Sequence, residues 1–137
     1  MADVHTPEQR SFNMSRIRAR DTKPELVVRS IVHQMGYRFR LHRNDLAGRP
    51  DLVLPGRRKI IFVNGCFWHM HRCRYGQVVP KTNADFWQVK RQRTMERDRK
   101  NRSDLRADGW QVLTVWECWT RDPERRLIPK LADFLPD

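Results

Sequence analysis

The spacing of hydrophobic residues predicts that helices and short strands alternate along the chain. Between residues 22 and 36 apolar side chains recur every three or four positions, as in an amphipathic helix, and Gly36 ends the run. Thr22 and Glu25 have the spacing of a capping box at its start. Residues 37–41 alternate between apolar and basic side chains, which predicts a strand with one buried face. A polar, basic arm over residues 1–20, with a helix start at Thr6-Pro7, precedes these elements.

The rest of the chain continues the alternation. Two short apolar runs, 51–54 and 59–63, flank a turn at Pro55-Gly56, which predicts a hairpin whose second strand is buried on both faces. A long charged helix over about residues 83–107, with Phe86 among its core positions, ends at Gly109. A strand at 110–115 and a helix at 123–134 follow. We therefore expect one α/β (α+β) domain over residues 1–137, with a mixed sheet flanked by helices.

The net charge of the chain indicates the kind of partner that it binds. Lysine and arginine total 28 residues against 16 aspartates and glutamates, which gives a formal net charge of +12. Such an excess is typical of nucleic-acid-binding proteins. A basic protein without a specific partner, or a fragment held by ribosomal RNA, is the alternative. No apolar run approaches the ~20 residues of a membrane helix, and residues 1–10 lack the apolar stretch of a signal peptide, so we expect a cytoplasmic protein without membrane contact.

Three cysteines, an odd number, fit poorly with a disulfide framework. Cys66, His71 and Cys73 lie within eight residues, and Cys118 after the last strand can complete a Cys₃His set, which is typical of structural zinc. The spacing C-x₄-H-x-C is not a common zinc-finger pattern, so buried free cysteines remain the alternative.

Asp51 and Asn64 mark one edge of the predicted hairpin. Asp51 begins the first strand, and the second strand ends at Val63-Asn64, so we expect the two to meet. A carboxylate in such a place can bind Mg²⁺, although it can equally cap a turn after Pro50. Glu25 is a capping-box residue on local grounds, and it can also face the same sheet edge and hold a metal-bound water.

His69 and several aromatic residues lie around the predicted zinc ligands. His69 would be held near Asp51, where an imidazole can exchange a proton with a phosphate oxygen; His5, His33 and His42 are interpreted as surface or core residues. Large aromatic side chains on a polar loop have little interior to fill and suit insertion between base pairs. These aromatic residues are Phe67, Trp68 and Trp87. Met14 on the basic arm is either a wedge into a DNA groove or a packing residue.

The run Asn64-Gly-Cys-Phe-Trp-His69, with His71, Cys73 and Trp116-Glu117-Cys118, resembles the very short patch repair (Vsr) mismatch endonucleases. The resemblance covers about residues 1–120. Further matching positions are Met1-Ala-Asp-Val-His5, Arg20-Asp21-Thr22, Gly48-Arg49-Pro50-Asp51, Phe86-Trp87, Lys90 and Arg97-Asp98.

The resemblance implies a restriction-endonuclease-like fold and a magnesium-dependent, DNA-nicking hydrolase. It implies that Asp51 and the backbone carbonyl of Val63 bind Mg²⁺, that His69 lies in the active site and that Glu25 supports it. It implies structural zinc at Cys66, His71, Cys73 and Cys118. Phe67, Trp68 and Trp87 would wedge beside a T:G mismatch, Met14 would enter from the minor groove, and Lys90 would read the site.

The implied reaction is a nick on the 5′ side of the mismatched thymine, which starts repair of deaminated 5-methylcytosine. We expect a monomer acting on double-stranded DNA in the bacterial cytoplasm, at the nucleoid, with mismatch-repair proteins and a repair polymerase as possible partners. A Vsr-like nuclease of different DNA specificity, or a zinc-stabilised DNA-binding module without catalysis, is the alternative.

Two positions depart from the family pattern. Asn64 stands where some members have a histidine thought to activate water, and an amide cannot act as a general base. The proton acceptor is then a hydroxide held by the metal, His69 or the phosphate itself. Thr94 stands where some members have an asparagine on the recognition helix, which leaves the flanking sequence preference open.

Overall fold

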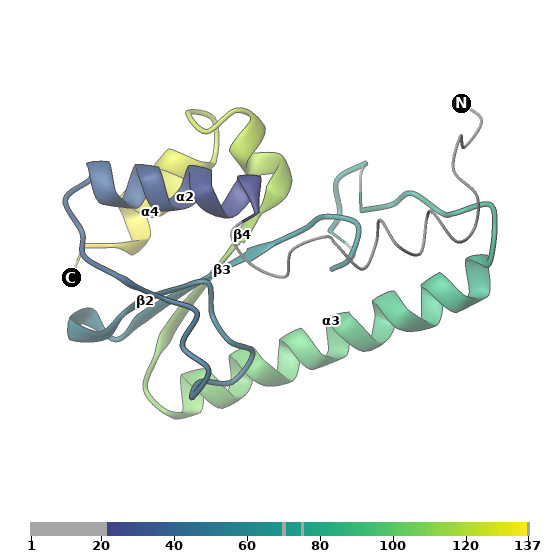
Figure 1. The fold of residues 1–137 in the computed structure, drawn as a ribbon, viewed down its shortest axis with the longest axis horizontal. Coiled ribbons are helices and arrows are strands. Elements are labelled where there is room, and N and C mark those ends of the chain that lie inside the picture. The colour runs from purple at the N-terminus through teal and green to yellow at the C-terminus, as the bar shows by residue number, and fades with distance from the viewer. Residues whose placement is uncertain (1–21, 70, 75, 137) are drawn as a thin grey trace.

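A four-stranded mixed sheet forms the centre of the computed structural model, which describes residues 22–69, 71–74 and 76–136 (Figure 1). The strand order is β1-β2-β3-β4. The first three strands are antiparallel neighbours, and β4 lies parallel to β3, with Val63 opposite Val115. The strands are β1 (Arg40–Leu41), β2 (Leu52–Leu54), β3 (Lys59–Asn64) and β4 (Gln111–Trp116).

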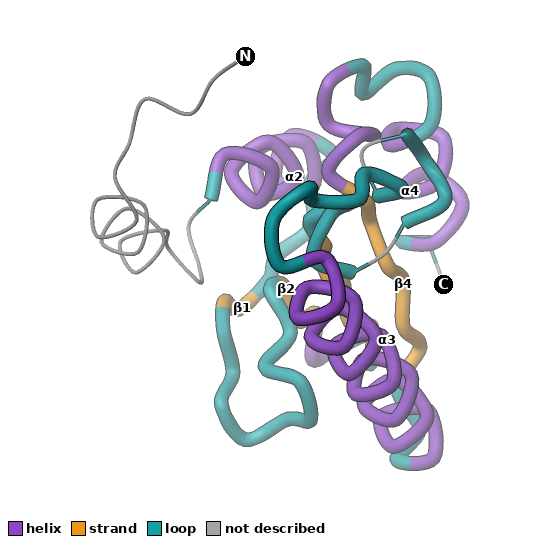
Figure 2. Tube along the Cα trace, turned by 90° about the vertical axis from the view of Figure 1, so that its right-hand side faces the viewer, coloured by secondary structure: helices purple, strands orange, loops and turns teal. Residues whose placement is uncertain are grey.

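Helices cover both faces of this sheet. Figures 1 and 2 show α2 (Lys23–Gln34) and α4 (Leu127–Phe134) on one face and α3 (Ala84–Ala107) on the other. Short 3₁₀ turns, Pro55–Arg57 and Glu117–Arg121, lie after β2 and after β4. The mixed sheet with flanking helices that the sequence predicted is confirmed for the described residues.

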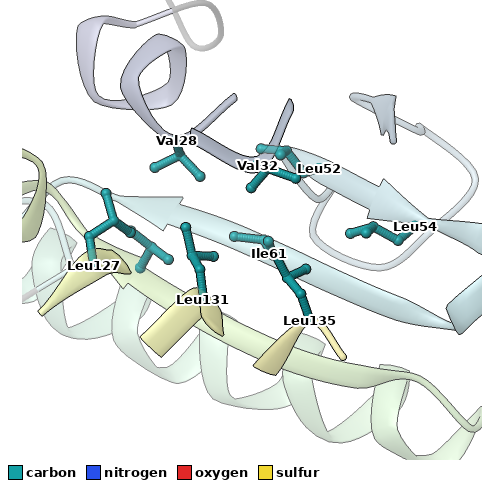
Figure 3. Packing of buried hydrophobic residues seen from close by; sticks show 9 residues of the cluster. Val28, Val32, Leu52, Leu54, Ile61, Leu127, Leu131 and Leu135 are labelled. Atoms are coloured by element: carbon teal, nitrogen blue, oxygen red, sulfur yellow. The ribbon is translucent and has the colours of Figure 1, made fainter. Parts of the chain in front are cut away.

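The strands distribute their side chains between two cores because successive residues point to opposite faces. Leu52 and Leu54 of β2 face α2 and α4, and Val53 between them packs with Ile60, Leu105 and Trp110 beside α3. In the larger core, fully buried leucines, isoleucine and valines from the sheet, α2 and α4 interdigitate (Figure 3). Full burial of each such side chain contributes about 1.5–3 kcal/mol. The larger core therefore holds α2 firmly against the sheet, and the candidate site lies where β2 starts and β3 ends.

Several predicted elements are confirmed with shorter or shifted bounds. The helix after residue 22 and the hairpin 51–63 are present, and Gly36 and Gly109 follow their helices at φ +91°, as helix-ending glycines do. The predicted strand 37–41 is wrong in most of its length, because only Arg40 and Leu41 pair with β2, and Leu41 is 41% exposed. The last helix begins at Leu127, after a turn in which Ile128 N–H donates to the Pro123 carbonyl.

Two local expectations are wrong for reasons of tertiary contact. Thr22 makes no side-chain capping hydrogen bond, and Glu25 points into the protein with only 3% of its surface exposed, so no capping box forms. Phe86 is not core, because 59% of it is exposed. Figure 1 shows why: the N-terminal half of α3 projects beyond the sheet, so that its apolar residues have no sheet to pack against. Among the described helices, none has the length and apolar character needed to cross a membrane.

Candidate active site and metal centres

Glu25, His42 and Asp51 form an acidic cluster near the end of β3. Each offers one ligand atom, and these atoms lie within 4.8 Å of one another. Glu25 comes from the first turn of α2, Asp51 immediately precedes β2, and His42 follows β1 with a φ of +48°. The Val63 N–H donates to Asp51 Oδ2 over 2.6 Å. The Asp51 carboxylate thus takes the place of a backbone carbonyl as acceptor, just beyond the last paired residues of β2 and β3. The hydrophobic core thus fixes α2 and β2, which carry or adjoin Glu25 and Asp51, and His42 joins them from the loop after β1.

The charge on Asp51 is disfavoured in this cluster. Burial is the main cause, and the neighbouring Glu25 adds to it; together they raise the pKa of Asp51 to about 7, against the opposing effects of the Val63 N–H and Arg29. A carboxyl group with such a pKa is partly protonated at neutral pH. A bound cation would favour the ionised form, so the cluster has the electrostatics of a cation site.

Arg29 and His42 hold the Glu25 side chain. The Arg29 guanidinium donates to Glu25 Oε2 over 3.1 Å and lies 2.8 Å from His42 Nε2. Because a guanidinium can only donate, Nε2 of His42 is the acceptor in its contact with Arg29. His42 was expected to be an ordinary surface or core residue. Its position beside Glu25 and Asp51 is a finding that sequence spacing could not supply, since it depends on the path of an irregular loop.

His69 lies on the loop after β3, where its backbone N–H donates to the Gly65 carbonyl over 3.1 Å. His69 Nδ1 makes a short hydrogen bond with Asp98 Oδ2 of α3. A carboxylate accepts, so Nδ1 is the donor in this contact. Asp98 therefore fixes the orientation of the His69 ring. Sequence reasoning gave it no role, because an aspartate on a highly charged helix has no distinguishing signal.

Cys66, His71, Cys73 and Cys118 form a second group, the Cys/His cluster, whose ligand atoms also lie within 4.8 Å of one another. His71 Nδ1 is 3.7 Å from Cys66 Sγ and 3.5 Å from Cys118 Sγ. A tetrahedral zinc with ordinary bond lengths separates a sulfur and a nitrogen ligand by about 3.6 Å. The predicted ligands are thus brought together, with a spacing that fits one tetrahedral ion.

The protonation of the Cys/His cluster follows from its burial. Burial raises the pKa of the Cys66 thiol to about 12 and also raises the pKa of Cys118. Burial and the cations Arg126 and Arg72 lower the pKa of His71, whose ring stacks on Trp116 at 4.1 Å between centroids. A neutral imidazole can bind a metal directly, whereas the thiols must lose protons when an ion binds.

Phe67, Trp68 and Trp87 form an aromatic cluster between the loop after β3 and the projecting half of α3. Their ring centroids are 5.3 to 6.1 Å apart in edge-to-face arrangements. Lys90 Nζ lies 5.5 Å from the Trp68 ring and 5.7 Å from the Trp87 ring. The aromatic residues singled out in the sequence therefore come together at one place, outside both hydrophobic cores. Met14 and the arm 1–20 lie outside the described residues.

Asn64 and Thr94, the two departures from the family pattern, are both described. Asn64 is the last residue of β3, opposite Trp116, and 6% of its surface is exposed. Thr94 Oγ1 donates to the Lys90 carbonyl over 3.1 Å within α3. The Asn64 amide thus lies at the end of the strand that leads into the Cys/His cluster, one residue after the partner of Asp51.

Comparison with known proteins identifies the family. A sequence profile of the DNA mismatch endonuclease Vsr family matches residues 2–75. The DNA mismatch endonuclease Vsr of Escherichia coli (strain K12) is 46% identical over 137 residues, which cover 100% of this chain and 87% of that protein. The type II nicking enzyme V.XorIIP of Xanthomonas oryzae pv. oryzae is 48% identical over 122 residues, or 89% of each chain. V.NmeAIP of Neisseria meningitidis serogroup A is 42% identical over 139 residues, covering 97% and 99%. The chain belongs to the Vsr family of DNA endonucleases.

Proposed function

We propose that this endonuclease nicks one strand of duplex DNA on the 5′ side of the thymine in a T:G mismatch, with Mg²⁺ as the catalytic ion and Zn²⁺ as a structural ion. The acidic cluster carries the proposal, because Glu25 and Asp51 bring two carboxyl groups together at one end of the sheet. Two carboxylates in a partly buried place repel each other unless a cation lies between them. Oxygen ligands in such small number suit Mg²⁺, which keeps several waters and binds substrate phosphates.

Asp51 and the Val63 carbonyl would hold the magnesium ion. In an extended strand the N–H and C=O of one residue point to the same side, so the Val63 carbonyl faces the edge where its N–H meets Asp51. Glu25, fixed by Arg29, would support the site from α2. When bound, the ion supplies a positive charge that stabilises the phosphate in the transition state.

Hydrolysis adds the oxygen of a water to phosphorus, breaks the bond to the 3′ oxygen and leaves a 5′-phosphate. His69 would move a proton at the attacking or the leaving oxygen through Nε2, since Asp98 occupies Nδ1. Asn64 cannot take a proton, so its amide would only orient the water. The chain's own contribution is therefore positioning by Asp51 and Glu25 and proton transfer by His69.

Zinc would close the Cys/His cluster. Three sulfurs and one nitrogen complete a tetrahedral shell, which leaves no open position for a substrate and makes the ion structural. It would fasten the loop after β3 to the turn that follows β4, because Cys66 lies on the first and Cys118 on the second. His69 lies between these ligands and would gain a fixed position from them.

The aromatic cluster and the basic charge would recognise the DNA. A T:G wobble pair is easier to unstack than a matched pair, so aromatic side chains that wedge between base steps favour the mismatch. Phe67, Trp68 and Trp87 would supply the wedge, Lys90 would contact the site, and Met14 of the arm would enter from the minor groove. The net charge of +12 supplies affinity for the phosphate backbone.

The proposed role is repair of deaminated 5-methylcytosine in a bacterial cell, by a monomer that hands a nicked strand to a repair polymerase and other mismatch-repair proteins. The second candidate is a nuclease of different DNA specificity. It is supported by relatives that are named type II nicking enzymes and by Thr94.

The proposal is tested with purified protein, Mg²⁺ and end-labelled duplexes that differ only at one base pair: T:G, T:A or C:G. We expect one nick, 5′ of the thymine, in the T:G duplex and much slower cutting of the matched duplexes. Equal cutting of all three would contradict the mismatch specificity and leave the second candidate. Denaturing gels of both labelled strands give the position of the nick.

A further inference from the structure

Arg91 of α3 is buried, unlike the residues beside it on the helix. Only 3% of its surface is exposed, whereas its neighbours Lys90, Gln92 and Arg93 are exposed. A buried charge costs folding free energy unless hydrogen bonds compensate for it. The position of this side chain therefore requires a structural explanation that a solvated basic helix does not need.

The guanidinium of Arg91 uses all three nitrogens on the loop that follows β3. Nε donates to the Phe67 carbonyl over 2.6 Å, Nη1 donates to the Val78 carbonyl over 2.9 Å, and Nη2 donates to the Gly76 carbonyl. The three acceptors span twelve positions of the sequence. One side chain thus joins the beginning of the loop to its end and fastens both to α3.

The same side chain also fixes an aromatic ring. The Arg91 guanidinium carbon lies 4.3 Å from the centroid of Phe67, which packs against Trp68 and Trp87. A planar guanidinium can stack on a ring and donate hydrogen bonds from its edge at once, which an ammonium cannot do. Arg91 therefore orders both the backbone and one ring of the aromatic cluster.

Gly76 links Arg91 to the Cys/His cluster. A Cβ atom at position 76 would collide with the backbone of His71, so only glycine allows the loop to approach this closely. The Gly76 N–H donates to the Cys73 carbonyl over 3.0 Å. Because Arg91 holds the Gly76 carbonyl, it supports this loop from α3. The Cys/His cluster connects the same loop to the turn after β4.

We propose that Arg91 is a positioning residue that holds the loop 66–78 and its aromatic residues against α3, and that through this contact it determines the preference for a mismatch. The second half of this inference rests on the proposed function; the first half does not. The role differs from a phosphate contact, because the nitrogens that would bind a phosphate are engaged with carbonyl groups inside the protein.

Three variants separate positioning from charge. Arg91→Met removes both charge and hydrogen bonds, and Arg91→Lys keeps the charge but cannot replace three donors and a stacked plane. Arg93→Met is the matched control, since it removes the same charge from an exposed position of the same helix. Zinc content and circular dichroism establish that each protein is folded.

The first readout is limited trypsin digestion, with cleavage at the exposed Arg72 and Arg74 mapped by mass spectrometry. We expect both Arg91 variants to be cut there about tenfold faster or more, because carbonyl groups that lose buried donors favour loop opening. The Arg93→Met protein should match the wild type. Wild-type protection in Arg91→Lys, or in both Arg91 variants, would overturn the positioning role.

The second readout is the ratio of nicking rates on T:G and T:A duplexes, with Trp68→Ala as the reference for a lost wedge. We expect Arg91→Met and Arg91→Lys to lower the ratio on the order of tenfold, as Trp68→Ala does, while Arg93→Met weakens binding to both duplexes alike. An unchanged ratio in the Arg91 variants, beside a lowered ratio in Trp68→Ala, would overturn the specificity role. If the wild type has no T:G preference, the proposed function fails, and digestion still decides whether Arg91 holds the loop.

Discussion

The acidic cluster and the Cys/His cluster both lie where β3 ends, yet they are built in different ways. Glu25 and Asp51 belong to α2 and the start of β2, which the larger hydrophobic core holds together. Cys66, His71 and Cys73 belong to a loop without regular structure, and Cys118 to the 3₁₀ turn after β4. The first cluster inherits its geometry from the core. The second joins an irregular loop to a 3₁₀ turn, and its ligands are not held by α2 or β2.

The two clusters also differ in the kind of ligand atom that they offer to an ion. Two carboxylates and an imidazole favour a hard ion that exchanges ligands and admits a phosphate, whereas three sulfurs and an imidazole favour a soft ion in a closed shell. Position in the fold and chemistry of the ligands therefore agree: carboxylates on rigid elements suit a catalytic ion, and thiols on a loop suit a structural ion.

The largest expected effect is on cleavage by the acidic cluster. Asp51→Asn keeps an acceptor for the Val63 N–H but removes the charge that would hold Mg²⁺ in the proposed site, so single-turnover nicking of a T:G duplex should fall by at least about 10³-fold. DNA binding should change little. Asp45→Asn, the same replacement on an exposed loop, is the control and should cut normally. Cleavage by Asp51→Asn at more than a tenth of the wild-type rate would remove Asp51 from the mechanism.

The next effect concerns the Cys/His cluster. Cys118→Ala removes one of the four proposed zinc ligands, and we expect zinc affinity to fall on the order of 10²-fold or more, with increased proteolysis of the loop 66–78. Elemental analysis of the purified protein and competition with a chelator measure the loss. Zinc content equal to that of the wild type would show that Cys118 is not a ligand. Melting of the two proteins with and without chelator separates zinc loss from general instability.

Proton transfer by His69 should have an intermediate effect. His69→Ala should lower single-turnover nicking about 10²-fold, the lower range for lost acid–base help. Asp98→Asn leaves the imidazole but loses the charged acceptor at Nδ1, so we expect a smaller loss, on the order of tenfold, and an altered pH–rate profile. A normal profile in Asp98→Asn would mean that the hydrogen bond with His69 has no part in the reaction.

The smallest effect is on stability without added magnesium. An unfolded Asp51 ionises near pH 4, whereas the folded protein retains the proton up to about pH 7, so the metal-free protein should lose stability as pH rises through this range. Asp51→Asn removes this loss and should be more stable by about 1 to 2 kcal/mol at pH 8. Urea unfolding at pH 5 and pH 8 measures it. If the wild type instead gained stability relative to Asp51→Asn as the pH rises, the expected direction of the pH dependence would be wrong.

The sequence predicted those parts of the fold that depend on local periodicity. The helix from residue 22 and the hairpin 51–63 follow from regular spacing, and the core that they form confirms it. The prediction that Phe86 is core was wrong because helical spacing marks an apolar face without saying whether anything covers it. The capping box at Glu25 was wrong because a capping glutamate and a buried glutamate can occupy the same position of a first helical turn.

The candidate site was predictable where residues of unusual type lie close in the sequence or where two strands of a hairpin meet. Cys66, His71 and Cys73 are the first case, and Asp51 beside the end of β3 is the second. His42, Asp98 and Arg91 were missed, since each acquires its contact from a segment at least thirteen positions away. Arg91 in particular is one of many basic residues on α3. Only the path of the loop distinguishes it from the solvated ones.

Anomalous X-ray scattering from crystals of the protein soaked with Mn²⁺, a substitute for Mg²⁺, tests the division between the two clusters most directly. Data collected at the zinc and manganese absorption edges assign each ion to its own site. We predict zinc bound by Cys66, His71, Cys73 and Cys118, and manganese beside Asp51 and the Val63 carbonyl. Zinc absent from the first set, or manganese bound away from Asp51, would contradict it.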